Sequence, residues 1–316
     1  MRTNADPSLT SEESALLDRA AAWPGCAWPD FTHEMIQQIT EREGIDFATA
    51  LLYDRLRGSE RHGPFIRSID TMPDTVEHAD RVTVVVVPGA FYREHPESGA
   101  DGGFVLEQAR RLGCRTALAP LESFGTIQHN VKLLCDWLDR QPTGPLILVS
   151  LSKAGAEVRL AFAEPDAFRN VVAWVNVSGL VRGTPMVNWL LRHPARALLI
   201  RMMFWWKGYA WTGVKELEWG PTGTLAGEFR VPADLLIVHL FGFPLARHLS
   251  RPLARRGHRR LTPLGPNDGG ANLLADLVGL PGLIYPVWGA DHYLKPAWDV
   301  QSLLLRIISY VVRERV

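Results

Sequence analysis

From about residue 81 onward, runs of β-branched residues alternate with amphipathic segments, and this alternation constrains the fold more than any other feature of the chain. The run VTVVVVPGA at 82–90 is apolar at almost every position, as expected for a parallel strand covered on both faces. Strands that alternate with helices predict a parallel sheet with right-handed crossovers. The sequence therefore predicts an α/β fold, with a mostly parallel sheet and helices on both faces.

The same pattern gives approximate positions for the elements. Strands are expected at 82–90, 114–121, 145–150, 171–180, 233–243 and 281–289, and helices near 103–112, 126–140, 154–165 and 297–314. Residues 1–78 have helical patterns only, with capping residues such as Thr10 and Thr32 before two of them. We expect an N-terminal helical extension over 1–78 and one further domain over 79–316.

The alternation stops after Gly183. Residues 188–219 are rich in Trp, Leu and Arg and have no strand pattern. We expect a helical insertion at about 184–232, before strand character returns at 233.

Charge and cysteine content argue against several classes of protein. The 316-residue chain has 34 basic and 34 acidic residues, so it lacks the positive surplus typical of nucleic-acid binders. Its three cysteines do not have the spacing of a disulfide framework or a zinc site. Acidic residues interrupt the first 23 residues, where a secretory peptide needs an apolar core, and the longest charge-free stretch, 277–290, holds only 14 residues. We expect a cytoplasmic protein without a nucleic-acid partner.

The strand at 145–150 runs into the segment Ser150-Leu151-Ser152-Lys153-Ala154-Gly155. A strand, a serine and a helix form a nucleophile elbow when a sharp turn lifts the serine above the carboxyl edge of the sheet. The residues two before and two after the serine, here Ser150 and Ala154, must be small because they lie together under the turn. The segment departs from the pattern G-x-S-x-G at both glycines but keeps this steric condition. In the alternative interpretation, Ser152 only caps the following helix.

On these residues, the chain from about 80 to 316 resembles the α/β-hydrolase superfamily; the resemblance leaves the N-terminal helices unexplained. It implies that Ser152 is the nucleophile. It also implies a histidine after the last strand and an acid in the loop before that strand, where this sequence has His292 and Asp268. A serine hydroxyl needs a neighbouring base, and the base needs an acid to orient it. The chain order Ser152, Asp268, His292 is the order found in α/β-hydrolases.

Simpler interpretations of both partners stay open. His292 could be a polar residue of a surface loop, and Asn267-Asp268-Gly269 could simply form a turn, which these residue types favour. Asp291 is adjacent to His292, but it is a weaker candidate for the acid because neighbouring side chains in an extended loop diverge.

An acyl-transfer enzyme also needs backbone N–H groups that bind the developing oxyanion. The resemblance implies that the residue after the nucleophile, Lys153, supplies one of them. The loop after the first strand would supply the other, from Ala90 or Phe91, because Gly89 lets the backbone approach closely.

The expected insertion is unusually aromatic: it contains Trp189, Phe204, Trp205, Trp206, Tyr209, Trp211 and Trp219. The superfamily commonly carries a cap at this place, so we expect Trp205, Trp206 and Tyr209 to contact an apolar acyl or alkyl group. Packing against the body of the domain is the alternative. The interleaved basic residues Arg192, Arg196, Arg201 and Lys207 would also suit a helix lying on a membrane or a lipid droplet.

Together these residues predict a serine hydrolase that acts on a small-molecule ester or thioester of a hydrophobic acid. Two alternatives stay open: an acyltransferase or cyclase that uses the same residues, and a non-catalytic binding protein, which the altered elbow would suit. The sequence has no G-x-G-x-x-G after a strand, no P-loop and no H-E-x-x-H motif. We expect neither a cofactor nor a metal ion.

Overall fold

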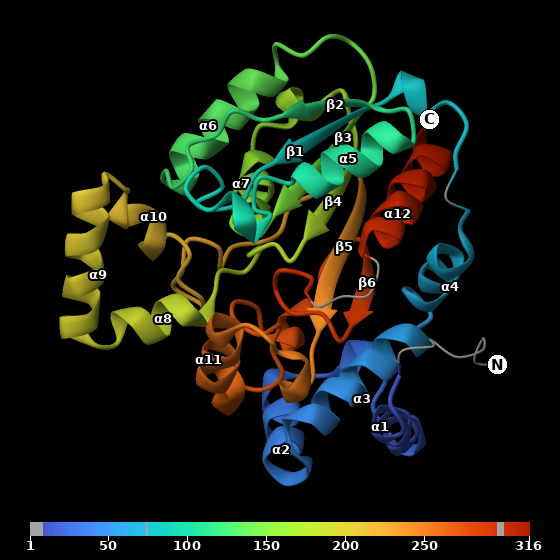
Figure 1. Ribbon diagram of the computed structural model, residues 1–316, viewed down its shortest axis with the longest axis vertical. Coiled ribbons are helices and arrows are strands. Elements are labelled where there is room, and N and C mark those ends of the chain that lie inside the picture. Colours follow the sequence, from blue (N-terminus) through green and yellow to red (C-terminus); the bar gives the residue numbers. More distant parts are fainter. Residues whose placement is uncertain (1–8, 74, 296–299) are drawn as a thin grey trace.

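The computed structural model describes residues 9–73, 75–295 and 300–316. A six-stranded sheet with the strand order β2-β1-β3-β4-β5-β6 forms its centre (Figure 1). The strands are β1 Thr83–Val87, β2 Arg115–Leu118, β3 Leu146–Leu151, β4 Val171–Val177, β5 Leu236–Phe243 and β6 Leu283–Trp288. All five strand pairs are parallel, and each strand overlaps one of the six expected ranges. The predicted α/β fold is confirmed.

Helices precede, connect and follow these strands. They are α1 Ser11–Ala22, α2 His33–Glu43, α3 Ile45–Gly58, α4 Gly63–Thr71, α5 Gly103–Arg111, α6 Ile127–Leu138, α7 Ala154–Ala161, α8 Pro185–Leu191, α9 Pro194–Lys207, α10 Trp211–Lys215, α11 Pro252–Leu261 and α12 Val300–Arg315. Helices α5 and α12 pack side by side on one face, and α6 and α7 on the other (Figure 1). The closing helix expected near 297–314 is α12, and the part of that range at 297–299 lies outside the described residues.

Helix α11 was not expected from the sequence. Its segment PLARRGHRRL is strongly basic, which hides the helical spacing of its buried residues, Ala254, His258 and Leu261. Residues that recur every three or four positions form one face of a helix, and Pro252 suits the first turn. This spacing is the signal that could have identified the helix.

The N-terminal helices pack on the β5–β6 side of the sheet. The ring of Tyr53 in α3 lies 4.8 Å from the ring of Trp288 and 5.9 Å from that of Phe243, measured between centroids. The backbone N–H of Ile284 in β6 donates to Nδ1 of His62 at 3.2 Å. One continuous hydrophobic core therefore joins α1–α4 to the strands. The division of the chain at residue 78 stays a prediction.

Helices α8, α9 and α10 form the insertion between β4 and β5. Figure 1 shows α9 standing away from the sheet. The inner side of the insertion has its own apolar cluster, which includes Phe124, Phe204 and Val214. In the described part of the chain, no helix has both the length and the apolar character needed to cross a bilayer.

Candidate active site

Ser152 occupies a sharp turn between β3, which ends at Leu151, and α7, which begins at Ala154. Its φ of +50° lies in the left-handed region, which non-glycine residues rarely adopt and which is strained unless neighbouring contacts hold it. Here the N–H of Ser152 donates to the carbonyl oxygen of Val177 at 3.0 Å, and its carbonyl oxygen accepts from Leu180 at 2.9 Å.

Helix capping does not explain this serine. The residue at the N-cap position of α7 is Lys153, and no side chain accepts a hydrogen bond from the first turn. The Ser152 side chain instead points to an imidazole, as described below. The capping interpretation is therefore wrong.

Small residues under the turn are required, and the requirement extends to Gly155. Ser150 is fully buried; its hydroxyl accepts from Trp174 Nε1 at 2.8 Å and donates to Asn176 Oδ1 at 3.1 Å. A Cβ atom at Gly155 would lie 2.6 Å from the Cα atom of Gly179 and equally close to Asn176 Oδ1. The turn therefore uses the glycine one position after the one in G-x-S-x-G.

The structure brings Ser152, His292 and Asp268 into one hydrogen-bonded series. The Oγ atom of Ser152 lies 2.9 Å from Nε2 of His292, and Nδ1 of His292 lies 2.7 Å from Oδ2 of Asp268. An N–H on Nδ1 donates to the carboxylate, which leaves Nε2 to accept a proton from the serine hydroxyl. The histidine lies in the loop after β6 and the acid in the loop after α11.

The carboxylate of Asp268 both stabilises the turn that follows this residue and orients His292. Oδ1 of Asp268 accepts the backbone N–H groups of Ala271 and Asn272, each at 2.9 Å, and Oδ2 accepts the side-chain amide of Asn272 at 2.8 Å. Burial alone would raise the pKa of Asp268, but the charge and hydrogen bond of His292 and the bonds from Asn272 hold it below its usual value. Asp268 therefore forms a turn and also contacts His292, so the two interpretations of this residue are compatible.

The pKa of His292 moves in the opposite direction. Burial of the imidazole alone would lower this pKa, but the negative charge and hydrogen bond of Asp268 raise it above the usual value, with a smaller contribution from Asp291. Asp291 itself closes the loop: its Oδ1 accepts from the backbone of Tyr293 at 2.9 Å and of Lys295 at 3.0 Å. Among the described residues, Asp268 rather than Asp291 is the acid whose carboxylate bonds to the imidazole of His292.

The structure distinguishes between Ala90 and Phe91, the two alternatives for the second expected oxyanion donor. The N–H of Phe91 donates to the carbonyl oxygen of Ser123 at 2.9 Å, so this group is already engaged. Within the described residues, the N–H groups of Ala90 and Lys153 have no hydrogen-bond partner. A Cβ atom at Gly89 would lie 3.1 Å from the carbonyl oxygen of Leu151, which shows how closely this loop approaches the elbow.

The buried position of the Lys153 side chain was not expected from the sequence. This side chain is 2% exposed, and its ammonium group forms an ion pair with the buried carboxylate of Glu157, which also accepts from Asn130 Nδ2 at 2.7 Å. Opposite charges four residues apart in a helix are a recognisable signal for such a pair. The pair fixes the residue that directly follows Ser152.

An aromatic cluster made of Phe91, Phe124, Phe204 and Tyr209 lies beside the elbow. Phe91 and Phe124 stack at 4.5 Å, Phe204 meets Phe124 at 5.0 Å, and Tyr209 meets Phe91 at 5.1 Å. The Nζ atom of Lys153 lies 5.7 Å from the centre of the Phe124 ring. Tyr209 belongs to this cluster, and its expected contact with an acyl group stays a prediction.

Trp205 and Trp206, unlike Tyr209, do not belong to the aromatic cluster. Their side chains are 83% and 76% exposed, so the expectation that they contact the acyl group is wrong for this structure. Phe204 takes the inward position of α9 with 6% exposure. Because successive residues of a helix point in different directions, the next two side chains face solvent.

No model of a protein family matches this sequence, and no curated protein sequence matches it. Solved structures do match. A carboxyl esterase from a metagenome has a TM-score of 0.60 and 18% identity, over 76% of this chain and 78% of that chain. A lipase from Bacillus licheniformis, in its mature form, has a TM-score of 0.50 and 19% identity, over 76% of this chain and 94% of that chain. With its parallel sheet and the strand-turn-helix at Ser152, this chain has the α/β-hydrolase fold.

Proposed function

We propose that this protein is a serine hydrolase that cleaves a carboxylic ester or thioester of a hydrophobic acyl group. One observation carries the proposal: the hydrogen-bonded series of Ser152, His292 and Asp268, with the serine held on a left-handed turn at the end of a strand. The similarity in fold to a carboxyl esterase and a lipase supports the same reaction class.

In the proposed reaction, Oγ of Ser152 attacks the carbonyl carbon while Nε2 of His292 takes the hydroxyl proton. The bond to the leaving alcohol or thiol then breaks, and the imidazolium returns its proton to that group. Water attacks the acyl-enzyme, gives a proton to His292 and releases the acid, after which the proton returns to Ser152. Asp268 keeps the imidazole oriented and stabilises its charged form.

The backbone N–H groups of Lys153 and Ala90 would bind the oxyanion. Each is free of an internal partner in the described chain and flanks the elbow. A donor of this kind is typically worth about 10²–10³ in kcat. The buried ion pair between Lys153 and Glu157 would keep the first donor in place.

The acyl group would lie against the aromatic cluster of Phe91, Phe124, Phe204 and Tyr209. These rings come from the loops after β1 and β2 and from the insertion, and Ala90, next to Phe91, packs on the same apolar cluster. Aromatic surface next to the reacting carbonyl favours an apolar acyl chain over a charged one.

The test combines an active-site label with a substrate series. A fluorophosphonate probe should label the wild-type protein and the Ser98→Ala control, whose changed side chain is half-buried and lies outside the series of Ser152, His292 and Asp268. It should not label Ser152→Ala. With aryl esters of graded acyl length, Ser152→Ala should lose on the order of 10⁶ in kcat.

The remaining alternatives give different results in the same experiment. A folded wild-type protein that neither labels nor turns over any ester would be a binding protein. Turnover that yields a new ester or amide when an alcohol or amine is present, with little free acid, would indicate an acyltransferase. Activity of Ser152→Ala within tenfold of the wild type would exclude the serine mechanism.

We also propose that α9 contacts a lipid surface. Of the ten large apolar side chains that are exposed in the described chain, six lie on this helix: Leu198, Leu199, Met202, Met203, Trp205 and Trp206. Arg201 and Lys207 are exposed among them. Apolar and basic side chains on one exposed helix suit the interface of an anionic membrane, and such a surface would bring an apolar ester close to the cap.

A further inference from the structure

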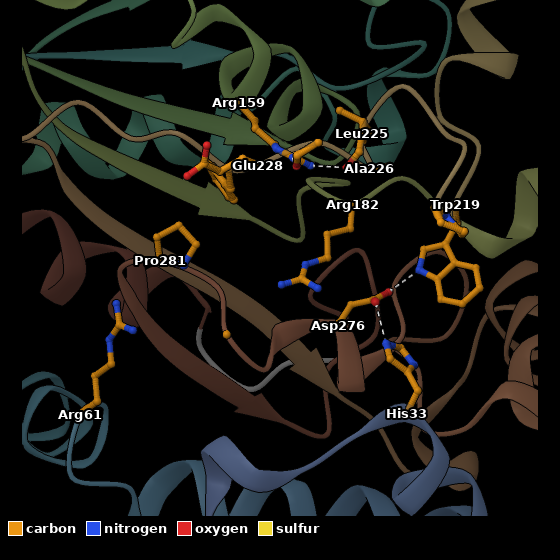
Figure 2. A pocket seen from close by; sticks show the side chains of 15 residues that line it. His33, Arg61, Arg159, Arg182, Trp219, Leu225, Ala226, Glu228, Asp276 and Pro281 are labelled. Atoms are coloured by element: carbon orange, nitrogen blue, oxygen red, sulfur yellow. Dashed lines mark hydrogen bonds and ion pairs between the residues drawn. The ribbon is translucent and has the colours of Figure 1, made fainter.

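A cavity of about 710 Å³ lies between α7 and the segments that precede β5 and β6. Figure 2 shows it, with side chains of Arg61, Arg159, Arg182, Trp219 and Asp276 around it. None of its lining residues belongs to the series of Ser152, His292 and Asp268. Its volume falls in the range of about 300–1,000 Å³ that is typical of small-molecule sites.

A buried cation forms one wall. Arg159 is 6% exposed and donates to the carbonyl oxygens of Val181, Leu225 and Gly227, the second at 2.6 Å. In the part of the chain that the structure describes, no carboxylate forms an ion pair with it. Burial, together with a smaller contribution from the positive charge of Arg182, lowers the pKa of Arg159 to about 10. A charge in this environment is costly unless an anion is near.

Two more guanidinium groups face the same space. Arg182 is half-buried, and it donates a long hydrogen bond, of 3.3 Å, to the carbonyl oxygen of Val278. Figure 2 shows its side chain reaching toward the middle of the cavity, and Arg61 at the edge, extending toward Pro281. Within the described part of the chain, the bond to Val278 is the one hydrogen bond that the guanidinium of Arg182 makes, so its other donors are available to a ligand.

Among the described residues, neither acidic side chain of the lining forms an ion pair with these arginines, because both are bonded to other residues. The carboxylate of Asp276 accepts from His33 Nε2 at 3.0 Å and from Trp219 Nε1 at 2.9 Å. Glu228 is exposed and pairs with Arg230 at 3.1 Å. The cavity thus has three arginines and no carboxylate directed at them among the described residues.

We propose that this cavity binds an organic anion, whose carboxylate or phosphate group is held by Arg182 in the field of Arg159 and Arg61. The planar guanidinium fork matches both kinds of oxyanion. The indole of Trp219 and the ring of Phe229 give the cavity apolar walls that would contact the organic part of the ligand. The site is separate from the proposed catalytic series, so the proposal does not depend on the hydrolase activity.

Titration calorimetry with the full chain tests the proposal. The probes are phenyl phosphate and benzoate, with benzyl alcohol as the neutral counterpart and inorganic phosphate as the anion without an apolar part. Both aromatic anions should bind the wild type more tightly than benzyl alcohol does. Whichever of phenyl phosphate and benzoate binds more tightly identifies the anionic group that the cavity prefers. Inorganic phosphate should bind more weakly than phenyl phosphate because it cannot contact Trp219.

The variant Arg182→Gln should weaken binding of the aromatic anions by about tenfold or more, as expected for the loss of a charge-assisted hydrogen bond. Arg140→Gln, which removes an exposed arginine outside the cavity, should bind like the wild type. Arg61→Gln changes an exposed side chain and gives a second variant if Arg182→Gln does not fold. It should weaken binding several-fold. Absence of anion binding up to millimolar concentration, or equal affinity in the wild type and in the folded cavity variants, would overturn the proposal.

Discussion

At the scale of single residues, His292 lies between a hydroxyl and a carboxylate, and the carboxylate sets its acid–base behaviour. The charge and hydrogen bond of Asp268 outweigh the effect of burial and raise the pKa of the imidazole. Only the neutral imidazole can take the proton of Ser152. The proposed base is thus inactive at low pH and becomes active as pH rises through this raised pKa.

We expect kcat/KM to increase with pH, with a midpoint above the usual histidine value. Asp268→Asn removes the charge that raises this pKa, so the midpoint should move to lower pH and kcat should fall by about 10⁴. The measurement is a pH profile of kcat/KM with one aryl ester. Asp291→Asn is the matched control and should have a much smaller effect, because the amide oxygen can still accept from Tyr293 and Lys295. If Asp291→Asn instead reduced kcat more than Asp268→Asn did, the acid would be Asp291.

Gly155 offers a stability test of the turn under Ser152. A methyl group at this position would lie 2.6 Å from the backbone of Gly179, so Gly155→Ala should reduce the free energy of unfolding by about 1–3 kcal/mol through overpacking. Gly58→Ala is the control, since Gly58 also lies in a helix and a Cβ atom there meets nothing within 4 Å. It should be neutral or slightly stabilising because alanine favours helices. Urea unfolding measures both, and equal stability of the two variants would contradict the proposed crowding.

The residues of the candidate site differ in how far the sequence could predict them. Ser152 and His292 follow strands, and the carboxyl ends of parallel strands meet at one edge of a sheet, so their proximity follows from topology. The catalytic roles stay a prediction. The bond from Phe91 to Ser123 could not be predicted, because it joins two loops that are distant in the chain. The direction of Trp205 was missed because it depends on which side of α9 packs inward.

At the scale of elements, the β-branched runs predict the sheet well because both faces of each strand are buried. Valines in β1 are buried at four successive positions, which no amphipathic helix would show. Helix α11 was missed because its polar residues outnumber its apolar ones. The insertion α8–α10 was predicted as helical, but the direction of its apolar side chains was not, since α9 leaves most of them in solvent.

This exposed surface of α9 leads to a prediction about membranes. The protein should sediment with phosphatidylglycerol vesicles, and the double variant Trp205→Ser/Trp206→Ser should bind at least tenfold more weakly because two large apolar groups no longer enter the interface. Replacing Arg201 and Lys207 by Gln should weaken binding only to anionic vesicles and mainly at low salt, at about 1 kcal/mol per charge. Leu118→Ser, which changes an exposed apolar residue outside α9, is the control. A wild-type protein that ignores both anionic and neutral vesicles would rule out the lipid contact.

At the scale of the whole molecule, the helices of residues 11–71 and the sheet behave as one packed body. The buried side chains of α1–α4 and of the strands belong to one cluster, which the alternation of strands and helices alone could not reveal. Polar contacts cross the same boundary: the carboxylate of Glu13 in α1 binds His248 and, at 3.1 Å, Arg247, both of which follow β5. We therefore expect a single cooperative unfolding transition.

The two neighbouring acids of α1 test this coupling. Glu13 is 4% exposed, whereas the side chain of Glu12, which also reaches Arg247, is 83% exposed. Glu13→Gln should lower the free energy of unfolding by about 1–3 kcal/mol, because it weakens buried, charge-assisted bonds. Glu12→Gln should change it by less than about 0.5 kcal/mol. Thermal unfolding followed by circular dichroism measures both.

The pH dependence of this difference follows from the pKa of Glu13. Burial alone would raise that pKa, but the hydrogen bond from the backbone of Thr10 and the contacts with His248 and Arg247 lower it in the folded protein. The stabilisation is therefore complete above the pKa of the unfolded chain and is lost as pH falls through the lower, folded-state pKa. At pH values below the folded-state pKa of Glu13, the wild type and Glu13→Gln should therefore have similar free energies of unfolding. A separate early transition in Glu13→Gln, with ester hydrolysis intact after it, would instead mean that the N-terminal helices fold as an independent unit.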